Sequence, residues 1–171
     1  PVLAGLTGDC SVTATAPTTT DVCAGTITGT TADPLTYNTQ GTYSIDWIFD
    51  DGNGNAITVP QSVTVDDNTA PTVLTQDITV QLDATGNVSI AAADIDNGSS
   101  DACGAVSLSL DVTSFDCTNL GDNTVTLTVT DANGNSSTGT AVVTVEDVTD
   151  PVTPVLAGLT GDCSVTATAP T

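Results

Sequence analysis

Hydrophobic and polar residues alternate strictly along several short stretches of this chain. In "NTVTLTVTD", Val125 and Leu127 fall on one face of an extended strand, and the threonines between them fall on the other. The stretch 43–49 places Ile45, Trp47 and Phe49 on one face in the same way, and "ITVQL" and "VSLSL" repeat the pattern. A period of two, interrupted by turn residues every 8–12 positions or so, predicts short strands with one packed and one solvated face.

The composition agrees with an all-β chain. Thr, Val and Ile dominate the alternating stretches, and these β-branched residues pack well on a pleated sheet. The predicted fold class is therefore all-β, as tandem immunoglobulin-like antiparallel β-sandwiches.

Two repeats organise the sequence. Residues Pro1–Thr18 recur unchanged at Pro154–Thr171, which sets a period of 153. A weaker repeat with an offset of 80 aligns 43–55 with 123–135 and Cys23 with Cys103. We therefore expect a first domain at 1–69, whose first few residues lie in the preceding repeat, a second at 70–150, and the start of the next copy at 151–171. The chain is expected to be one window of a longer tandem array.

The charge excludes several classes of function. The formal net charge is −21, with no Lys, Arg or His. Nucleic acids and anionic membrane surfaces attract basic side chains, so neither is an expected partner. No apolar run is long enough to span a membrane in this segment. Without His or Lys, no base-activated nucleophile can be assembled, so the chain is not expected to be an enzyme. A pair of Asp residues acting on a glycoside is the weaker alternative.

The segment from "DNTAPTVLTQDITVQL" through "DNTVTLTVTDANGNSSTGTAVVTVEDVTDP" resembles the hyalin-repeat (HYR) domain. The features that match are an Asp-x-Thr-x-Pro entry, an "ITV" first strand and a "TVTLTVTDANGNS" hairpin. The resemblance covers the second domain and, more loosely, the first. Tandem copies of such domains look like the long surface adhesins of gliding Bacteroidota. The resemblance implies an immunoglobulin-like fold and an adhesive or spacer role without catalysis.

Five cysteines occur without a CxxC motif, which predicts disulfides and an oxidising, extracellular compartment rather than a zinc site. One bridge in each domain is expected, Cys10–Cys23 and Cys103–Cys117, with Cys163 paired outside the window. The family's cysteine pattern is kept only in part. In our alignment Val88 stands opposite Cys10, and Tyr37 stands opposite Cys117, so the two bridges should be placed differently.

Two short loops carry the most pointed chemistry. Each has oxygen-bearing side chains at positions one, three and five, as in the first half of a calcium loop. The same sequences are also strong hairpin-turn signals. The residues are Asp51, Asn53 and Asn55 in "DGNGN" and Asp131, Asn133 and Asn135 in "DANGN".

The topology of a sandwich brings each of these loops near an acidic linker. Carboxylates gathered there would repel one another unless a cation bridged them, so we predict calcium between domains. The linker ligands expected are Asp66 and Asp67 at the first junction and Glu146, Asp147 and Asp150 at the next. The loop "DIDNGSSD", with Asp94, Asp96 and Asp101, is expected at the same end as the first of these linkers.

The function that these features favour is a structural repeat unit of a long extracellular stalk, filament or adhesin on a bacterial cell surface. Its expected partners are neighbouring copies in the same array, self-association into filaments, and a surface polysaccharide. A carbohydrate-binding accessory module of a secreted enzyme is the alternative. The row of Thr side chains at 124–130 also suggests an ice- or water-ordering face, although Thr is ordinary on the wet face of a strand.

Overall fold

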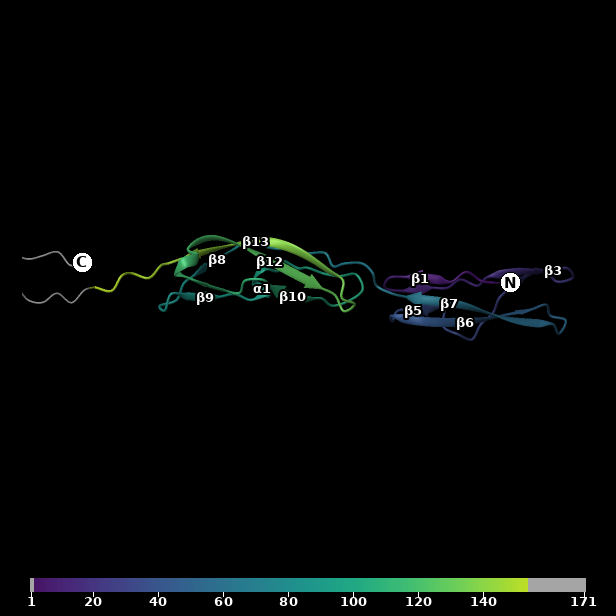
Figure 1. The fold of residues 1–171 in the computed structure, drawn as a ribbon. Coiled ribbons are helices and arrows are strands. Elements are labelled where there is room, and N and C mark those ends of the chain that lie inside the picture. The colour runs from purple at the N-terminus through teal and green to yellow at the C-terminus, as the bar shows by residue number, and fades with distance from the viewer. Residues whose placement is uncertain (1, 154–171) are drawn as a thin grey trace, which may run out of the picture.

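The computed structural model of the chain describes residues 2–153, and these form an all-β protein with several sheets. Strands account for 49% of the described residues and helices for 5%, so sheets alone build the packed interior. Figure 1 shows an elongated molecule in which two β-units lie end to end. We call residues 2–65 the first unit and residues 78–146 the second unit.

The first unit is built around one long hairpin. Residues Gly41–Asp50 (β6) and Ala56–Val65 (β7) pair over their whole length, from Gly41↔Val65 to Asp50↔Ala56. A three-stranded sheet has the order β1-β7-β6, and two small sheets pair β2 with β5 and β3 with β4. The remaining strands are β1 (Leu6–Gly8), β2 (Val12–Thr13), β3 (Thr18–Asp21), β4 (Gly25–Thr28) and β5 (Thr36–Tyr37).

The second unit repeats this plan. Its long hairpin pairs Gly121–Thr130 (β12) with Ser136–Glu146 (β13). A four-stranded sheet has the order β10-β12-β13-β8, and a small sheet pairs β11 with β9. The remaining elements are β8 (Ile78–Gln81), β9 (Asn87–Ser89), α1 (Ala92–Ile95), β10 (Ser107–Leu110), β11 (Ser114–Asp116) and the 3-10 turn η1 (Cys117–Asn119).

The pairing of the first and last strands corrects the prediction of purely antiparallel sheets. β1 runs parallel to β7, with Leu6 opposite Val63, and β8 runs parallel to β13, with Ile78 opposite Val143. When the first and last strands of a unit are parallel, the chain enters at one end of the unit and leaves at the other. This arrangement lets the units follow one another in a line, as Figure 1 shows.

Each unit has its own hydrophobic core, and the two cores share no residue. The prediction from the alternating pattern is confirmed: Trp47 is 1% exposed in the first core, and Leu127 is 0% exposed at the matching place in the second. The indole Nε1 of Trp47 donates a hydrogen bond of 2.9 Å to Gln61 Oε1. Gln61 Nε2 in turn donates to the backbone oxygen of Ala4 at 2.8 Å, so this buried polar chain is satisfied.

One helical turn was not predicted. α1 follows Ala91 in the run "IAAADI", where alanines favour helix. The carboxylate of Asp94 accepts a hydrogen bond from the Ala91 N–H at 2.8 Å, which closes the turn, and Ile95 is fully buried in the second core.

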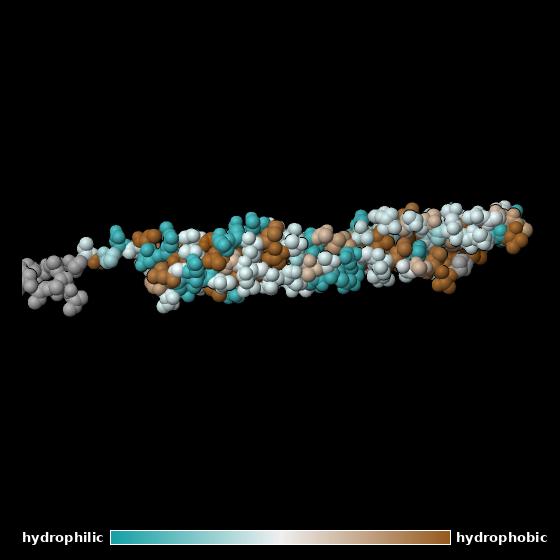
Figure 2. All heavy atoms as spheres, turned by 90° about the horizontal axis from the view of Figure 1, so that it is seen from above, coloured by the Kyte–Doolittle hydropathy of each residue, from teal (hydrophilic) through white to brown (hydrophobic). Residues whose placement is uncertain are grey.

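No helix in the described part of the chain is long and apolar enough to cross a membrane. The surface instead mixes polar and apolar residues along its length. In Figure 2, hydrophilic residues gather around the middle of the molecule, where the units meet, while brown apolar residues are prominent at the end that carries β3.

Candidate functional site: the junction between the units

The junction is formed by turns that the parallel topology brings to facing ends of the two units. The first unit contributes the turn after β1, the loop before β6 and the linker that follows β7. The second unit contributes the loop 96–106 and the turn between β12 and β13. The linker is tied to the turn after β1, since Asp66 N donates to the Gly8 oxygen at 3.0 Å and Thr69 Oγ1 donates to Asp9 Oδ2 at 2.8 Å.

A disulfide crosses the junction. Cys10 of the first unit is bonded to Cys103 of the second, with a Cα–Cα distance of 4.8 Å, inside the usual range for disulfides. Cys23 and Cys117 are exposed free thiols. The predicted pairs Cys10–Cys23 and Cys103–Cys117 are therefore wrong, and Cys163 lies outside the described residues.

The physical reason is that each predicted pair is separated by the length of a unit. Cys10 follows β1 beside the linker, at the Gly41↔Val65 end of the long hairpin. Cys23 lies at the tip of the β3–β4 hairpin, near the β6–β7 turn at the other end. A ladder of ten residues is about 30 Å long, and a disulfide cannot span more than about 7 Å between Cα atoms. Closeness in sequence was a misleading guide.

The "DANGN" loop is a closed turn that also reaches the linker. Asp131 Oδ1 accepts the backbone N–H groups of Asn133 at 2.8 Å and Asn135 at 2.9 Å, and Oδ2 accepts Asn135 Nδ2 at 2.9 Å. Burial raises the pKa of Asp131, but the hydrogen bonds from Asn135 and Asn133 outweigh it and leave the pKa below its ordinary value. Asn135 Nδ2 also donates to the backbone oxygen of Asp67 at 3.0 Å. Hence the loop and the linker meet, as the sandwich topology predicted.

A pair of amide side chains adds a second direct contact. Gln40 Nε2 donates to Asn133 Oδ1 at 3.1 Å, and Asn133 Nδ2 donates back to Gln40 Oε1. The same Gln40 oxygen accepts the backbone N–H of Asp67 at 3.2 Å. Sequence reasoning did not find Gln40, because nothing in "YNTQG" distinguishes it from an ordinary loop residue before the topology is known.

Asp67 and Asp101 form the acidic part of the junction. Ligand atoms of Asp67, Asp101 and Cys103 all lie within 4.8 Å of one another, and Asp67 is only 4% exposed. The two carboxylates suit calcium, but six to eight oxygen ligands are usual for that ion, and the Cys103 sulfur belongs to the disulfide. Each carboxylate also accepts a backbone N–H, from Thr69 and Cys103 respectively. The fit to calcium is partial, and calcium stays a prediction.

The other predicted ligands lie apart from this cluster. Asp66 is exposed and bonds with Asn68 at the edge beside β1. Glu146, Asp147 and Asp150 are exposed at the far end of the second unit, where Asp147 caps its own turn by accepting the Thr149 N–H at 2.9 Å. The structure therefore divides the predicted ligands between the junction and the two ends of the molecule.

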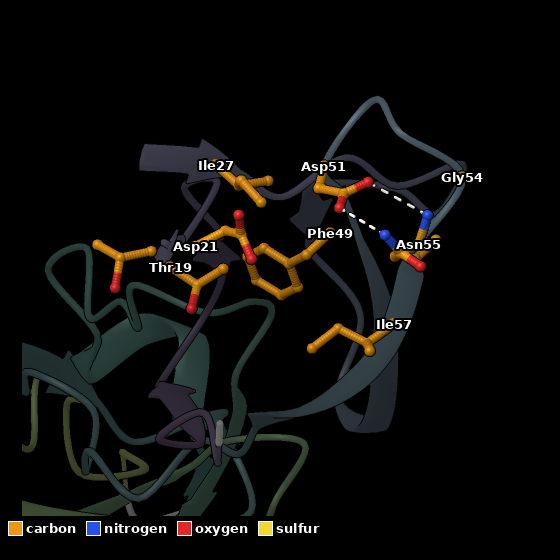
Figure 3. A pocket seen from close by; sticks show the side chains of 10 residues that line it. Thr19, Asp21, Ile27, Phe49, Asp51, Gly54, Asn55 and Ile57 are labelled. Atoms are coloured by element: carbon orange, nitrogen blue, oxygen red, sulfur yellow. Dashed lines mark hydrogen bonds between the residues drawn. The ribbon is translucent and has the colours of Figure 1, made fainter. Parts of the chain in front are cut away.

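Asp51, Asn53 and Asn55 occupy the free end of the first unit. Asp51 accepts Asn53 N at 2.8 Å and Asn55 Nδ2 at 2.8 Å, the same turn that Asp131 makes, and the Asn55 side chain lowers the pKa of Asp51. Figure 3 shows this turn near Phe49, with Asp21 on the facing hairpin. The pocket that these residues line has a volume of about 590 Å³. Phe49 is 3% exposed, so the pocket presents little aromatic surface.

The amide pair gives a prediction with a matched control. Asn133→Ala should weaken the junction by about 0.5–1.5 kcal/mol, the usual net value of a hydrogen bond, and should speed hydrogen exchange at the Asp67 N–H. Asn53→Ala removes the equivalent side chain from the other loop, where the described residues offer it no partner beyond its own turn. Exchange measured by NMR should change for Asn133→Ala alone, and equal changes in both variants would contradict the role given to Gln40.

Comparison with known proteins adds little to this geometry. No family model matches the chain, and no curated protein matches it. One similar solved structure is the endo-fucoidan hydrolase MfFcnA9 from glycoside hydrolase family 107. The match covers 84% of this chain and 32% of the hydrolase, with 10% identity and a TM-score of 0.31. The chain thus spans about a third of that protein, and a likeness this low supports no conclusion about fold or activity.

Proposed function

We propose that the chain is a structural repeat unit of a long extracellular stalk, filament or adhesin on a bacterial cell surface. The observation that carries this proposal is the Cys10–Cys103 disulfide, which fixes two separately packed units end to end. A module that must transmit tension or hold a tip at a distance needs such alignment. The unchanged repeat of residues 1–18 at 154–171 supports continuation of the same pattern.

The fold supports the same proposal. We infer that each unit is an immunoglobulin-type β-sandwich of the hyalin-repeat kind, because the long hairpin and the small facing sheets enclose one core in each unit. Parallel pairing of the first and last strands places entry and exit at opposite ends. Modules of this type, linked in series, make a quasi-one-dimensional array in which each touches mainly its neighbours.

Charge and redox chemistry fit an extracellular array. A net charge of −21 keeps such a fibre soluble and discourages nonspecific collapse. A structural disulfide is typical of oxidising compartments outside the cytosol, which supports secretion.

The carbohydrate-binding alternative has weaker support. Such modules present an exposed aromatic platform to a sugar ring. Trp47, Phe49, Phe115 and Tyr37 are all buried here. Tyr43 is half-buried and packs against Tyr37, with ring centroids 4.7 Å apart and the rings tilted by 33°. None of the five aromatic residues of the chain offers a flat exposed face.

Small-angle scattering on a chain of two complete 153-residue copies tests the proposal. Strands of ten residues give units of about 30–40 Å, so each copy should add about 70 Å of length and two copies should scatter as a rod. A compact particle of the size expected for a single globular domain would overturn the proposal. Repeating the measurement with calcium and then with a chelator tests the calcium prediction separately, because a cation at Asp67 and Asp101 would make the joint stiffer only while it is bound.

A further inference from the structure

The free cysteines lie at opposite ends of the molecule, and we propose that they form a disulfide between successive copies: Cys117 of one copy bonds to the counterpart of Cys23 in the next. This inference rests on the proposed array. It gives the second type of junction, from the second unit to the first unit of the next copy, a covalent link like the Cys10–Cys103 link of the first junction.

Cys23 is presented in the same way as Cys103. The two cysteines correspond at the offset of 80, and each follows an Asp by two residues. Asp21 Oδ1 accepts the Cys23 N–H at 2.8 Å, and Asp101 Oδ1 accepts the Cys103 N–H at 2.7 Å. The second unit uses Cys103 in this turn to bond with Cys10. The first unit therefore presents Cys23 at its free end in the same kind of turn.

Cys117, in the 3-10 turn η1, supplies the second cysteine of the proposed bond. In the first unit, Cys10 lies in the turn that joins β1 to β2. The corresponding turn of the second unit joins β8 to β9, and Cys117 Sγ lies 3.7 Å from the backbone oxygen of Gly86 within it. A thiol thus lies at the same turn as in the first unit, although the alignment places no cysteine there. The register of the small sheets gives the true correspondence, because Val12 pairs with Tyr37 in the first unit and Val88 pairs with Phe115 in the second. Val88 therefore corresponds to Val12, and Tyr37 corresponds to Phe115. The alignment of Val88 with Cys10 and of Tyr37 with Cys117 is wrong.

Spacing along the chain allows the two junctions to match. Between β7 and β8 lie residues 66–77. β1 begins at Leu6, and the counterpart of Leu6 in the repeated sequence is Leu159. Residues 147–158 lie between the end of β13 and that position. Both links contain twelve residues, so the second junction has the same length of chain available as the first.

Both free ends also expose apolar side chains beside the thiol. Val22, next to Cys23, is fully exposed, and Leu120, close to Cys117, is 52% exposed. In an array these two ends face each other. Burial of Val22 and Leu120 where the two ends meet would stabilise the contact in addition to the disulfide.

The bond forms by ordinary thiol–disulfide chemistry. The Cys117 thiolate displaces one sulfur of an external disulfide such as oxidised glutathione, and the facing Cys23 thiolate then displaces the second. The two protein thiols lose two protons and two electrons, and the reagent leaves as two thiols. Both cysteines are exposed, so the reagent can reach them.

The test is a count of free thiols in a dilute chain of two complete copies, equilibrated with oxidised and excess reduced glutathione so that an unpartnered cysteine returns to the thiol, then unfolded and alkylated. Two free thiols are expected, the Cys23 of the first copy and the Cys117 of the second, and four would overturn the proposal. Cys23→Ser in the first copy should leave one free thiol. The same substitution in the second copy should leave three, because it also frees the Cys117 of the first copy. If each variant instead had one free thiol fewer than the unaltered two-copy chain, the proposal would also be overturned.

Scattering on the same samples separates this proposal from the array itself. Four free thiols in a molecule that still scatters as a rod would remove the second bridge and leave the array standing. The expected result is two free thiols in a molecule that scatters as a rod. With Cys23→Ser in the second copy, the rod should bend more sharply at the junction between the copies. A compact particle would overturn the array, and with it the junction that the bridge is meant to close.

Discussion

Trp47→Ala should lower the free energy of unfolding of the first unit by about 3–5 kcal/mol, the range for truncating a large buried aromatic. Trp47 is 1% exposed and is the largest fully buried side chain of the molecule's described part. Its loss would leave a cavity between the long hairpin and the small sheets, and would leave Gln61 Oε1 without its 2.9 Å partner. Calorimetry is the appropriate measurement, since Trp47 is the one tryptophan of the chain and its fluorescence disappears with it.

Leu127→Ala is the matched control in the second unit. It should cost about 2–5 kcal/mol there, while the unfolding of the first unit, followed by Trp47 fluorescence, should stay where it is. The two cores share no residue, so each substitution should move one transition. A shift of both transitions by either variant would show that the units fold as one cooperative body.

Removal of the junction disulfide by Cys10→Ser with Cys103→Ser should produce the second large effect. The bond closes a loop with a sequence separation of 93, and chain-entropy estimates give about 4–5 kcal/mol for a loop near this length. Most of the loop is the first unit, so urea unfolding followed by Trp47 fluorescence should show the loss. Cys23→Ser with Cys117→Ser removes the two free thiols instead, and in a single copy this control should unfold like the unaltered chain. A similar loss in both double variants would contradict the assigned pairing.

The strands and cores could be predicted from the sequence because they depend on a local pattern. Alternation alone places Ile45, Trp47 and Phe49 inside, and all three are buried. The parallel pairing of β1 with β7 was not predictable in this way, because a three-residue strand carries no signal of its direction. Its partner is set by the packing of the whole unit.

The cysteine pairing failed for a related reason, although a signal was present. Cys23 and Cys103 correspond at the offset of 80, so bridges inside the units should have had corresponding partners. Cys10 and Cys117 do not correspond, and this mismatch already argued against one bridge in each unit. The "DxNGN" loops were assigned to the correct ends, but the bonds of Asn133 to Gln40 depend on two units meeting, which no single-unit pattern contains.

The disulfide of the first junction also changes how the molecule would carry a load. Tension applied along the covalent chain passes directly from Cys10 to Cys103. The segment between these two cysteines, whose sequence separation is 93, therefore bears no load. That segment would supply about 300 Å of slack if it were drawn out, and it contains nearly the whole first unit. A pulled molecule would release this hidden length only after reduction of the bond. Its extensibility therefore depends first on the redox state of its surroundings, and only after reduction on the folding stability of the first unit.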